Sequence, residues 1–170
     1  MFTGAAECDD VPKFLFYGKG VAPIVIDTIL QSAIWRGKNV KNDELDLQVP
    51  MHDVGACFSQ KGQFINVLTY ENKLRVYDIR GTQRRPVKDD EIKGVAPRSK
   101  MSKLASDSSN ELYLYAGNDM GEILQLDTRK DCQMVGKFKG ITTSISGIAV
   151  GQGQLVSSSM DSYVRMYDLE

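Results

Sequence analysis

The chain has 170 residues, 42% of them hydrophobic, which is enough for one domain with a buried core. Its 21 basic and 22 acidic residues nearly cancel, so no overall charge draws it to nucleic acid or to an acidic membrane. The scattered cysteines Cys8, Cys57 and Cys132 lack CxxC spacing, which argues against a disulfide framework or zinc site and favours a reducing, intracellular setting. No stretch approaches the ~20 apolar residues of a membrane helix, so no membrane partner is expected.

The first fifty residues show little regular patterning. Residues 1–20 stay unassigned, although 14–17 could form a strand before a glycine-containing turn at 18–20. Residues 24–27 and 31–36 have the pattern of the third strand and the outer strand of a degraded repeat unit. A polar connection rich in Asn and Asp follows at 37–50 and ends at Pro50.

From there on, a pattern of two antiparallel strands joined by a tight turn recurs. The clearest copy is 155–169, where an apolar start leads through a turn into an alternating strand ending on Tyr167-Asp168. Earlier copies occupy 64–78 and 112–127. Aspartates close the pattern with a period of roughly 40–50 residues, which is typical of WD-repeat blades. These aspartates are Asp27, Asp78, Asp127 and Asp168.

The sequence therefore predicts an all-β fold, an incomplete WD-repeat β-propeller over 21–170 with about three four-stranded blades plus part of a fourth. The predicted boundaries are a blade remnant at 21–50 and blades at about 51–98, 99–139 and 140–170. Inner strands are expected at 54–59, 102–106 and 144–150, outer strands at 85–91 and 133–138, and a turn at 107–110. Because a ring needs ~4–8 blades, we expect the chain to be the C-terminal part of a longer ring.

The sequence contains no motif of an enzyme active site. GxxxxGK[ST], GxGxxG, GxSxG and HExxH are all missing from it. His52, the only histidine, precedes an inner strand beside Asp53, where a hydrogen-bonded loop histidine is favoured over a general base. The predicted inner strands supply no carboxylate or histidine ligands, which disfavours a propeller hydrolase. We therefore expect no catalytic residue, metal site, cofactor or small-molecule substrate.

Two stretches, 35–50 and 82–87, are more polar than a scaffold requires. The connection from Arg80 to Lys103 as a whole holds eight basic and three acidic residues. Loop Arg and Lys side chains can contact phosphates, and Asn can bind base edges or backbone groups. On composition alone, turn formation by the Asn and Asp residues and a solvated row of cations are favoured instead. The candidate residues for a surface that binds a partner or RNA are Arg36, Lys38, Asn39, Lys41, Asn42, Asp43, Arg84 and Arg85.

These stretches resemble a known family. The residues that carry the resemblance are Arg36-Gly37-Lys38-Asn39-Val40-Lys41-Asn42-Asp43, Leu45-Asp46-Leu47, Val49-Pro50 and Gln83-Arg84-Arg85-Pro86-Val87. They are similar to the signature of the WD repeat-containing protein 74 family, the Nop-seven-associated (NSA) ribosome biogenesis factors, and the resemblance runs from Trp35 to Leu169.

The resemblance implies a seven-bladed propeller in the nucleus and nucleolus, of which this chain is the C-terminal portion. Its implied role is that of a non-catalytic assembly factor for the large (60S) ribosomal subunit, which binds pre-ribosomal particles. The implied partners are other pre-ribosome assembly proteins and a AAA-type ATPase, and direct contact with pre-ribosomal RNA is compatible with it. The alternative is a generic WD-repeat adaptor, such as a ubiquitin-ligase substrate receptor or a signalling scaffold, which the blades alone do not exclude.

Overall fold

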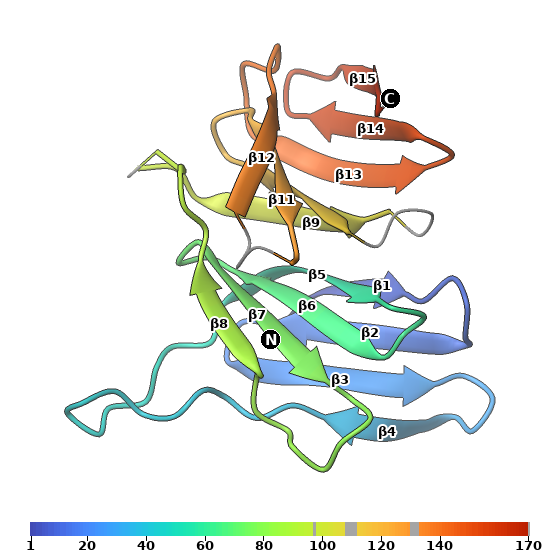
Figure 1. Ribbon diagram of the computed structural model, residues 1–170, viewed down its shortest axis with the longest axis vertical. Coiled ribbons are helices and arrows are strands. Elements are labelled where there is room, and N and C mark those ends of the chain that lie inside the picture. Colours follow the sequence, from blue (N-terminus) through green and yellow to red (C-terminus); the bar gives the residue numbers. More distant parts are fainter. Residues whose placement is uncertain (97, 108–111, 130–132, 170) are drawn as a thin grey trace.

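The computed structural model describes residues 1–96, 98–107, 112–129 and 133–169, and these contain strands and loops without any helix. Within these ranges there is accordingly no helix that could cross a membrane. The strands form four antiparallel sheets that follow one another along the chain (Figure 1). Each sheet is a simple meander, because every strand pairs with its neighbour in sequence.

The strand bounds are as follows. The first sheet holds β1 (Phe2–Glu7), β2 (Lys13–Gly18), β3 (Val21–Asp27) and β4 (Ser32–Arg36). The second holds β5 (Asp53–Ser59), β6 (Phe64–Thr69), β7 (Lys73–Asp78) and β8 (Lys88–Glu91). The third holds β9 (Met101–Ser106), β10 (Tyr113–Asn118), β11 (Ile123–Asp127) and β12 (Gln133–Phe138). The fourth holds β13 (Ile145–Gly151), β14 (Gln154–Ser159) and β15 (Val164–Asp168).

The predicted fold is confirmed as an incomplete, all-β propeller with three four-stranded sheets and one three-stranded sheet. The fourth sheet has three strands, and the two strands expected as a blade remnant within 21–50 are β3 and β4 of a full first sheet. Residues 1–20, left unassigned, supply β1 and β2 of a full first sheet. β1 is not predictable from the sequence, because its Gly and Ala residues are weak strand formers. Its strand conformation depends on pairing with β2. Most of the turn expected at 107–110, like Cys132, lies outside the described residues.

The four sheets pack face to face around their first strands. β1, β5, β9 and β13 lie next to one another in that order and form the hub (Figure 1). Three apolar clusters fill the successive interfaces between sheets, so the second and third sheets are covered on both faces. This explains why β6 and β10 are buried almost throughout, whereas β15 alternates between exposed and half-buried residues.

The periodic aspartates repeat one turn geometry. Oδ1 of Asp27, Asp78 and Asp127 each accepts a hydrogen bond from the backbone N–H two residues later, at 2.8, 3.0 and 2.9 Å. A carboxylate that caps a turn in this way satisfies a backbone donor that has left the sheet. The sequence period therefore corresponds to a repeated connection between the third and outer strands.

The end of β4 is held firmly against the second sheet. The buried Trp35 ring meets Tyr77 edge-on, with 5.6 Å between ring centroids. Gly37 follows at a point where a Cβ atom would lie 2.9 Å from the Pro23 ring, so a side chain there would force the chain apart. Trp35 and Gly37 thus fix where the connection 37–52 leaves the first sheet.

A candidate partner-binding surface

The two polar stretches of the sequence meet in space. The backbone N–H of Lys38 donates to the backbone oxygen of Arg84 at 2.7 Å, which joins the connection 37–52 to the connection 79–87. A hollow of about 240 Å³ opens beside this contact. Its lining comes from both connections and from the start of β8: Val40, Lys41, Gln83, Arg85, Pro86, Val87, Lys88 and Asp89. We call residues 36–43 and 83–88 the rim surface.

The Asn and Asp residues of the rim surface hold the connection in shape. Nδ2 of Asn39 donates to the backbone oxygen of Val49 at 2.6 Å, and Nδ2 of Asn42 donates to Oδ1 of Asp46 at 2.8 Å. Oδ1 of Asp43 accepts from the N–H groups of Leu45 and Leu47 at 3.0 and 2.8 Å. The turn-forming role expected from the sequence therefore accounts for these three side chains, because their polar groups bind the connection itself.

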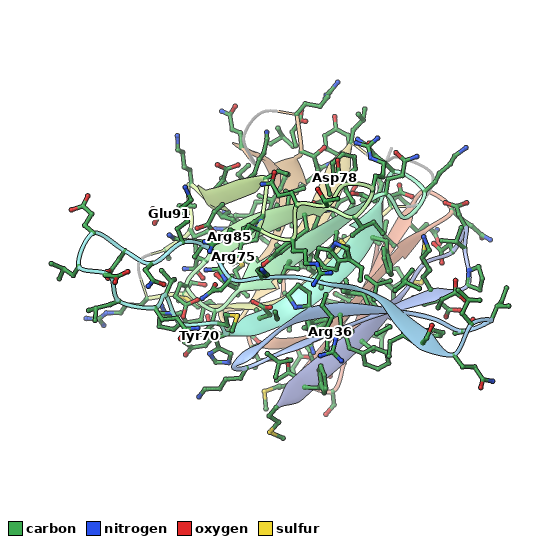
Figure 2. All side chains as sticks on the ribbon, turned by 90° about the horizontal axis from the view of Figure 1, so that it is seen from below. Arg36, Tyr70, Arg75, Asp78, Arg85 and Glu91 are labelled. Carbon is green, nitrogen blue, oxygen red and sulfur yellow. The ribbon has the colours of Figure 1, made fainter. Side chains whose placement is uncertain are left out.

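Five cations of the rim surface are exposed to solvent or to a partner. Arg36, Lys38, Lys41, Arg84 and Arg85 are all exposed, and none forms an ion pair with another described residue. Lys41 and Arg85 line the hollow together. Arg36 lies apart from Arg85, at the end of β4 (Figure 2). The structure thus brings together Lys38, Lys41, Arg84 and Arg85 but not Arg36.

A second hollow, which the sequence did not single out, opens where the inner strands begin. It measures about 450 Å³, and we call it the hub pocket. Its lining residues are Thr3, His52, Asp53, Val54, Tyr70, Lys100, Met101, Ser102, Lys103 and Asp119. Two of them, Lys100 and Lys103, belong to the basic connection of residues 80–103. The signal that could have found them is their position at the start of a predicted inner strand.

The walls of the hub pocket hold an unusual carboxyl group. Asp53 is only 2% exposed, and its Oδ1 atom has no hydrogen-bond partner among the described residues. Burial raises the pKa of Asp53 to about 7, although the nearby guanidinium of Arg75 opposes the change. Arg75 is itself buried and its Nε donates to Oδ1 of Asp89 at 3.1 Å.

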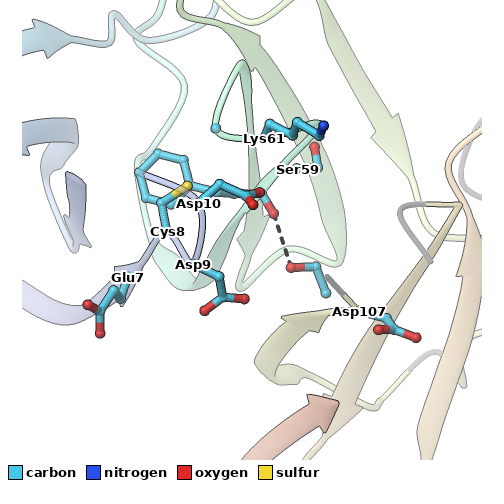
Figure 3. A pocket seen from close by; sticks show the side chains of 10 residues that line it. Glu7, Cys8, Asp9, Asp10, Ser59, Lys61 and Asp107 are labelled. Carbon is cyan, nitrogen blue, oxygen red and sulfur yellow. Dashed lines mark hydrogen bonds between the residues drawn. The ribbon is translucent and has the colours of Figure 1, made fainter. Parts of the chain in front are cut away.

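A third hollow lies at the opposite end of the inner strands and is much smaller, about 40 Å³ (Figure 3). Glu7, Asp9, Asp10 and Asp107 surround it together with Lys61 and the buried Cys8. Oγ of Ser106 donates to the backbone oxygen of Phe58 at 3.0 Å across it. Among the described residues no group of three potential ligands is arranged to hold a metal ion.

Comparison with known proteins identifies relatives. No family model matches the chain. The chain is 30% identical over 142 residues to human WD repeat-containing protein 74, covering 82% of this chain and 35% of that protein. It is 35% identical over 152 residues to ribosome biogenesis protein NSA1 of Kluyveromyces lactis, covering 81% and 35%. The match to NSA1 of Saccharomyces cerevisiae is 27% over 197 residues and covers 96% and 42%. The chain therefore spans about a third to two fifths of the length of these relatives.

Proposed function

This chain is homologous to the C-terminal portion of WD repeat-containing protein 74 and the NSA1 ribosome biogenesis proteins, and from that premise we propose that it acts in ribosome biogenesis. Its proposed role is that of a non-catalytic assembly factor for the large (60S) ribosomal subunit in the nucleolus. The propeller binds pre-ribosomal particles there, through other assembly proteins, with a AAA-type ATPase as a further partner.

One observation supports the rim surface as the site of this binding. The stretches 36–43 and 83–87 are separated by the whole of β5, β6 and β7, yet the Lys38–Arg84 hydrogen bond joins them. Their four neighbouring cations have no ion pair among the described residues. Arg and Lys in such a position form charge-assisted hydrogen bonds with carboxylates or phosphates of a partner.

The rigid setting of these cations favours binding as well. Because Asn39, Asn42 and Asp43 hold the connection by their own hydrogen bonds, less conformational entropy is lost when a partner binds.

The test is sucrose-gradient sedimentation of the tagged full-length gene product from cells, with and without RNase. We expect co-migration with large-subunit precursors that RNase treatment abolishes. A variant with Lys38, Lys41, Arg84 and Arg85 all changed to alanine should move to the light fractions. The matched control changes two exposed cations outside the rim surface, Lys93→Ala and Arg98→Ala, and should stay with the particle.

Two outcomes would overturn the proposal in different ways. A gene product that stays light under all conditions would favour the WD-repeat adaptor. Unchanged co-migration of the four-alanine variant would retain the biogenesis role and remove the rim surface from it.

A further inference from the structure

The connection 37–52 is longer than the crossing between two sheets requires. The equivalent connections, 92–100 between β8 and β9 and 139–144 between β12 and β13, join an outer strand to the next inner strand with fewer residues. The extra chain extends away from the four sheets before it returns to β5 (Figure 1, Figure 2). A turn at residues 43–48 closes this extension, and we call it the tip.

The tip holds two large apolar side chains in water. Leu45 is 79% exposed and Leu47 is 59% exposed. The turn is nevertheless ordered, because the backbone N–H of Asp43 donates to the backbone oxygen of Leu47 at 3.0 Å, and Oδ1 of Asp43 accepts from both leucine amides. Two neighbouring leucines displayed by an ordered turn favour an interaction site over a passive loop.

The tip is also acidic. It carries the carboxylates of Asp43, Glu44 and Asp46, and none of the three forms an ion pair with another described residue. The surface that covers the tip must therefore combine apolar contacts for the leucines with cations for the carboxylates.

The hollow of the rim surface, which we call the rim hollow, has this combination. Its one carboxylate, Asp89, is already paired with Nε of Arg75 at 3.1 Å and with Nζ of Lys73 at 3.8 Å. The rest of the lining is therefore apolar and cationic, apart from Gln83. It consists of Val40, Pro86 and Val87 together with Lys41, Arg85 and Lys88.

We infer that the tip of one copy of this chain docks in the rim hollow of a second copy. The leucines of the tip cover the apolar wall of the hollow, and Glu44 pairs with Arg85 of the other copy. The closed turn keeps the leucines of a single chain in water. Tip and hollow belong to neighbouring parts of one connection, so a two-fold axis beside it lets the two copies exchange the contact reciprocally.

A second copy fits better than other occupants because it covers both surfaces at once. An unrelated acidic segment would fill the rim hollow and leave the leucines of the tip exposed. RNA would meet the carboxylates of the tip, which repel phosphates. The inference does not rest on the proposed function, but the dimer covers Lys41 and Arg85, so self-association and particle binding should exclude each other.

The test measures the mass of the purified full-length gene product by sedimentation equilibrium over a concentration series. We expect wild type to form a dimer as the concentration rises. The variant L45A/L47A removes four leucines from the symmetric contact and should raise the Kd of the dimer at least about a hundredfold. The matched control, I29A/L30A, changes another exposed apolar pair, in the turn between β3 and β4, and should leave the Kd unchanged.

Charge exchange tests the pairing itself. Glu44→Lys and Arg85→Glu each place like charges at the contact, and each should raise the Kd about tenfold because every substitution acts twice in the dimer. An equimolar mixture of these two variants should recover the wild-type Kd. In the mixed dimer the substituted tip meets the substituted hollow, and the unsubstituted tip meets the unsubstituted hollow. Recovery also shows that both variants are folded.

Three results would overturn the inference: a monomer at every concentration, a dimer whose Kd does not respond to L45A/L47A, or a mixture that associates no better than either variant alone. The proposed function is judged separately in the sucrose gradient. There L45A/L47A should stay with large-subunit precursors, because it retains Lys41 and Arg85.

Discussion

The rim surface and the hub pocket are both polar, but their polar groups are used differently. In the rim surface the uncharged and acidic side chains bind one another and the local backbone, as Asn42 does with Asp46 and Asp43 with Leu47. In the hub pocket Oδ1 of Asp53 is buried without a hydrogen-bond partner among the described residues, and Nζ of Lys100 lies over the Tyr70 ring. Hydrogen-bond satisfaction thus differs between the two surfaces, which lie only a few strands apart.

The difference also bears on stability. Lys38, Lys41, Arg84 and Arg85 are solvated and contribute little to the folded state. Asp53 and Arg75 are buried ionisable groups, and their removal or titration has a large effect. The following experiments exploit this contrast, beginning with the largest expected effect.

The pH dependence of unfolding should depend on Asp53. Its pKa is about 7 in the folded chain and near the ordinary value of about 4 in the unfolded chain, so the folded state binds the proton more tightly. This stabilisation is complete below about pH 4 and is lost as pH rises to about 7, a total of about 4 kcal/mol. Urea unfolding at successive pH values should show this decline in wild type and not in Asp53→Asn.

Two ion-paired carboxylates lose their stabilisation outside that window. Lys137 lowers the pKa of Glu122, and Arg165 lowers that of Asp161, so their stabilisation is lost only as pH falls below their ordinary values. An Asp53→Asn variant with the same decline between about pH 4 and 7 as wild type would contradict the assignment.

Arg75→Met should destabilise the chain by about 3 kcal/mol. The substitution leaves Asp89 without its principal ion-pair partner, and it removes a positive charge that stabilises the ionised carboxyl group of Asp53. Arg84→Met, on the rim surface, should change the free energy of unfolding by no more than about 0.5 kcal/mol. Chemical denaturation monitored by the fluorescence of Trp35 measures both. Equal changes in the free energy of unfolding for the two variants would contradict the distinction between the buried and the solvated cation.

Removing two cations from the rim surface should affect binding and leave stability unchanged. For Lys41→Ala combined with Arg85→Ala, we expect association with large-subunit precursors to fall about thirtyfold, since each of the two lost contacts contributes about 1 kcal/mol. Quantitative co-purification of the particle measures this effect, with K93A/R98A as control. A parallel loss of thermal stability would show that the two residues support the fold and not the partner.

Asp43→Ala should have a small effect that is confined to one turn. The variant loses two acceptor contacts at Leu45 and Leu47 in an exposed turn, which should cost about 1 kcal/mol locally. Hydrogen exchange of these two amides should rise, while Asp43→Asn, which keeps an Oδ1 acceptor, should stay near wild type. Unaltered exchange in the alanine variant would mean that the turn is held by the backbone alone.

Much of the fold could be predicted because its signals are local. Alternating apolar residues and periodic turn-capping aspartates located the strands from residue 53 onward, and each lies within a few residues of its expected place. β1 could not be found in this way. Its glycine and alanines carry little strand signal, and Gly4 is required by the Tyr17 ring of the partner strand, a contact visible only in three dimensions.

The candidate surfaces show the same division. The rim stretches stood out because their polar residues are contiguous, but their union through Lys38 and Arg84 depends on how β4 and β7 end. The hub pocket draws His52, Tyr70 and Lys100 from three separate elements, so no window of sequence contains it. Binding of a partner by the rim residues stays a prediction, to which the structure adds that Lys38, Lys41, Arg84 and Arg85 lie together.

The most direct test of the central claim is site-specific photocrosslinking in cells. A photoreactive phenylalanine analogue replaces Lys41 in one full-length gene product and Lys93 in another. We predict that position 41 forms crosslinks to components of large-subunit precursors and that position 93 does not. Crosslinks of equal yield at both positions, or none to these particles from position 41, would contradict the assignment of the rim surface as the particle-binding site.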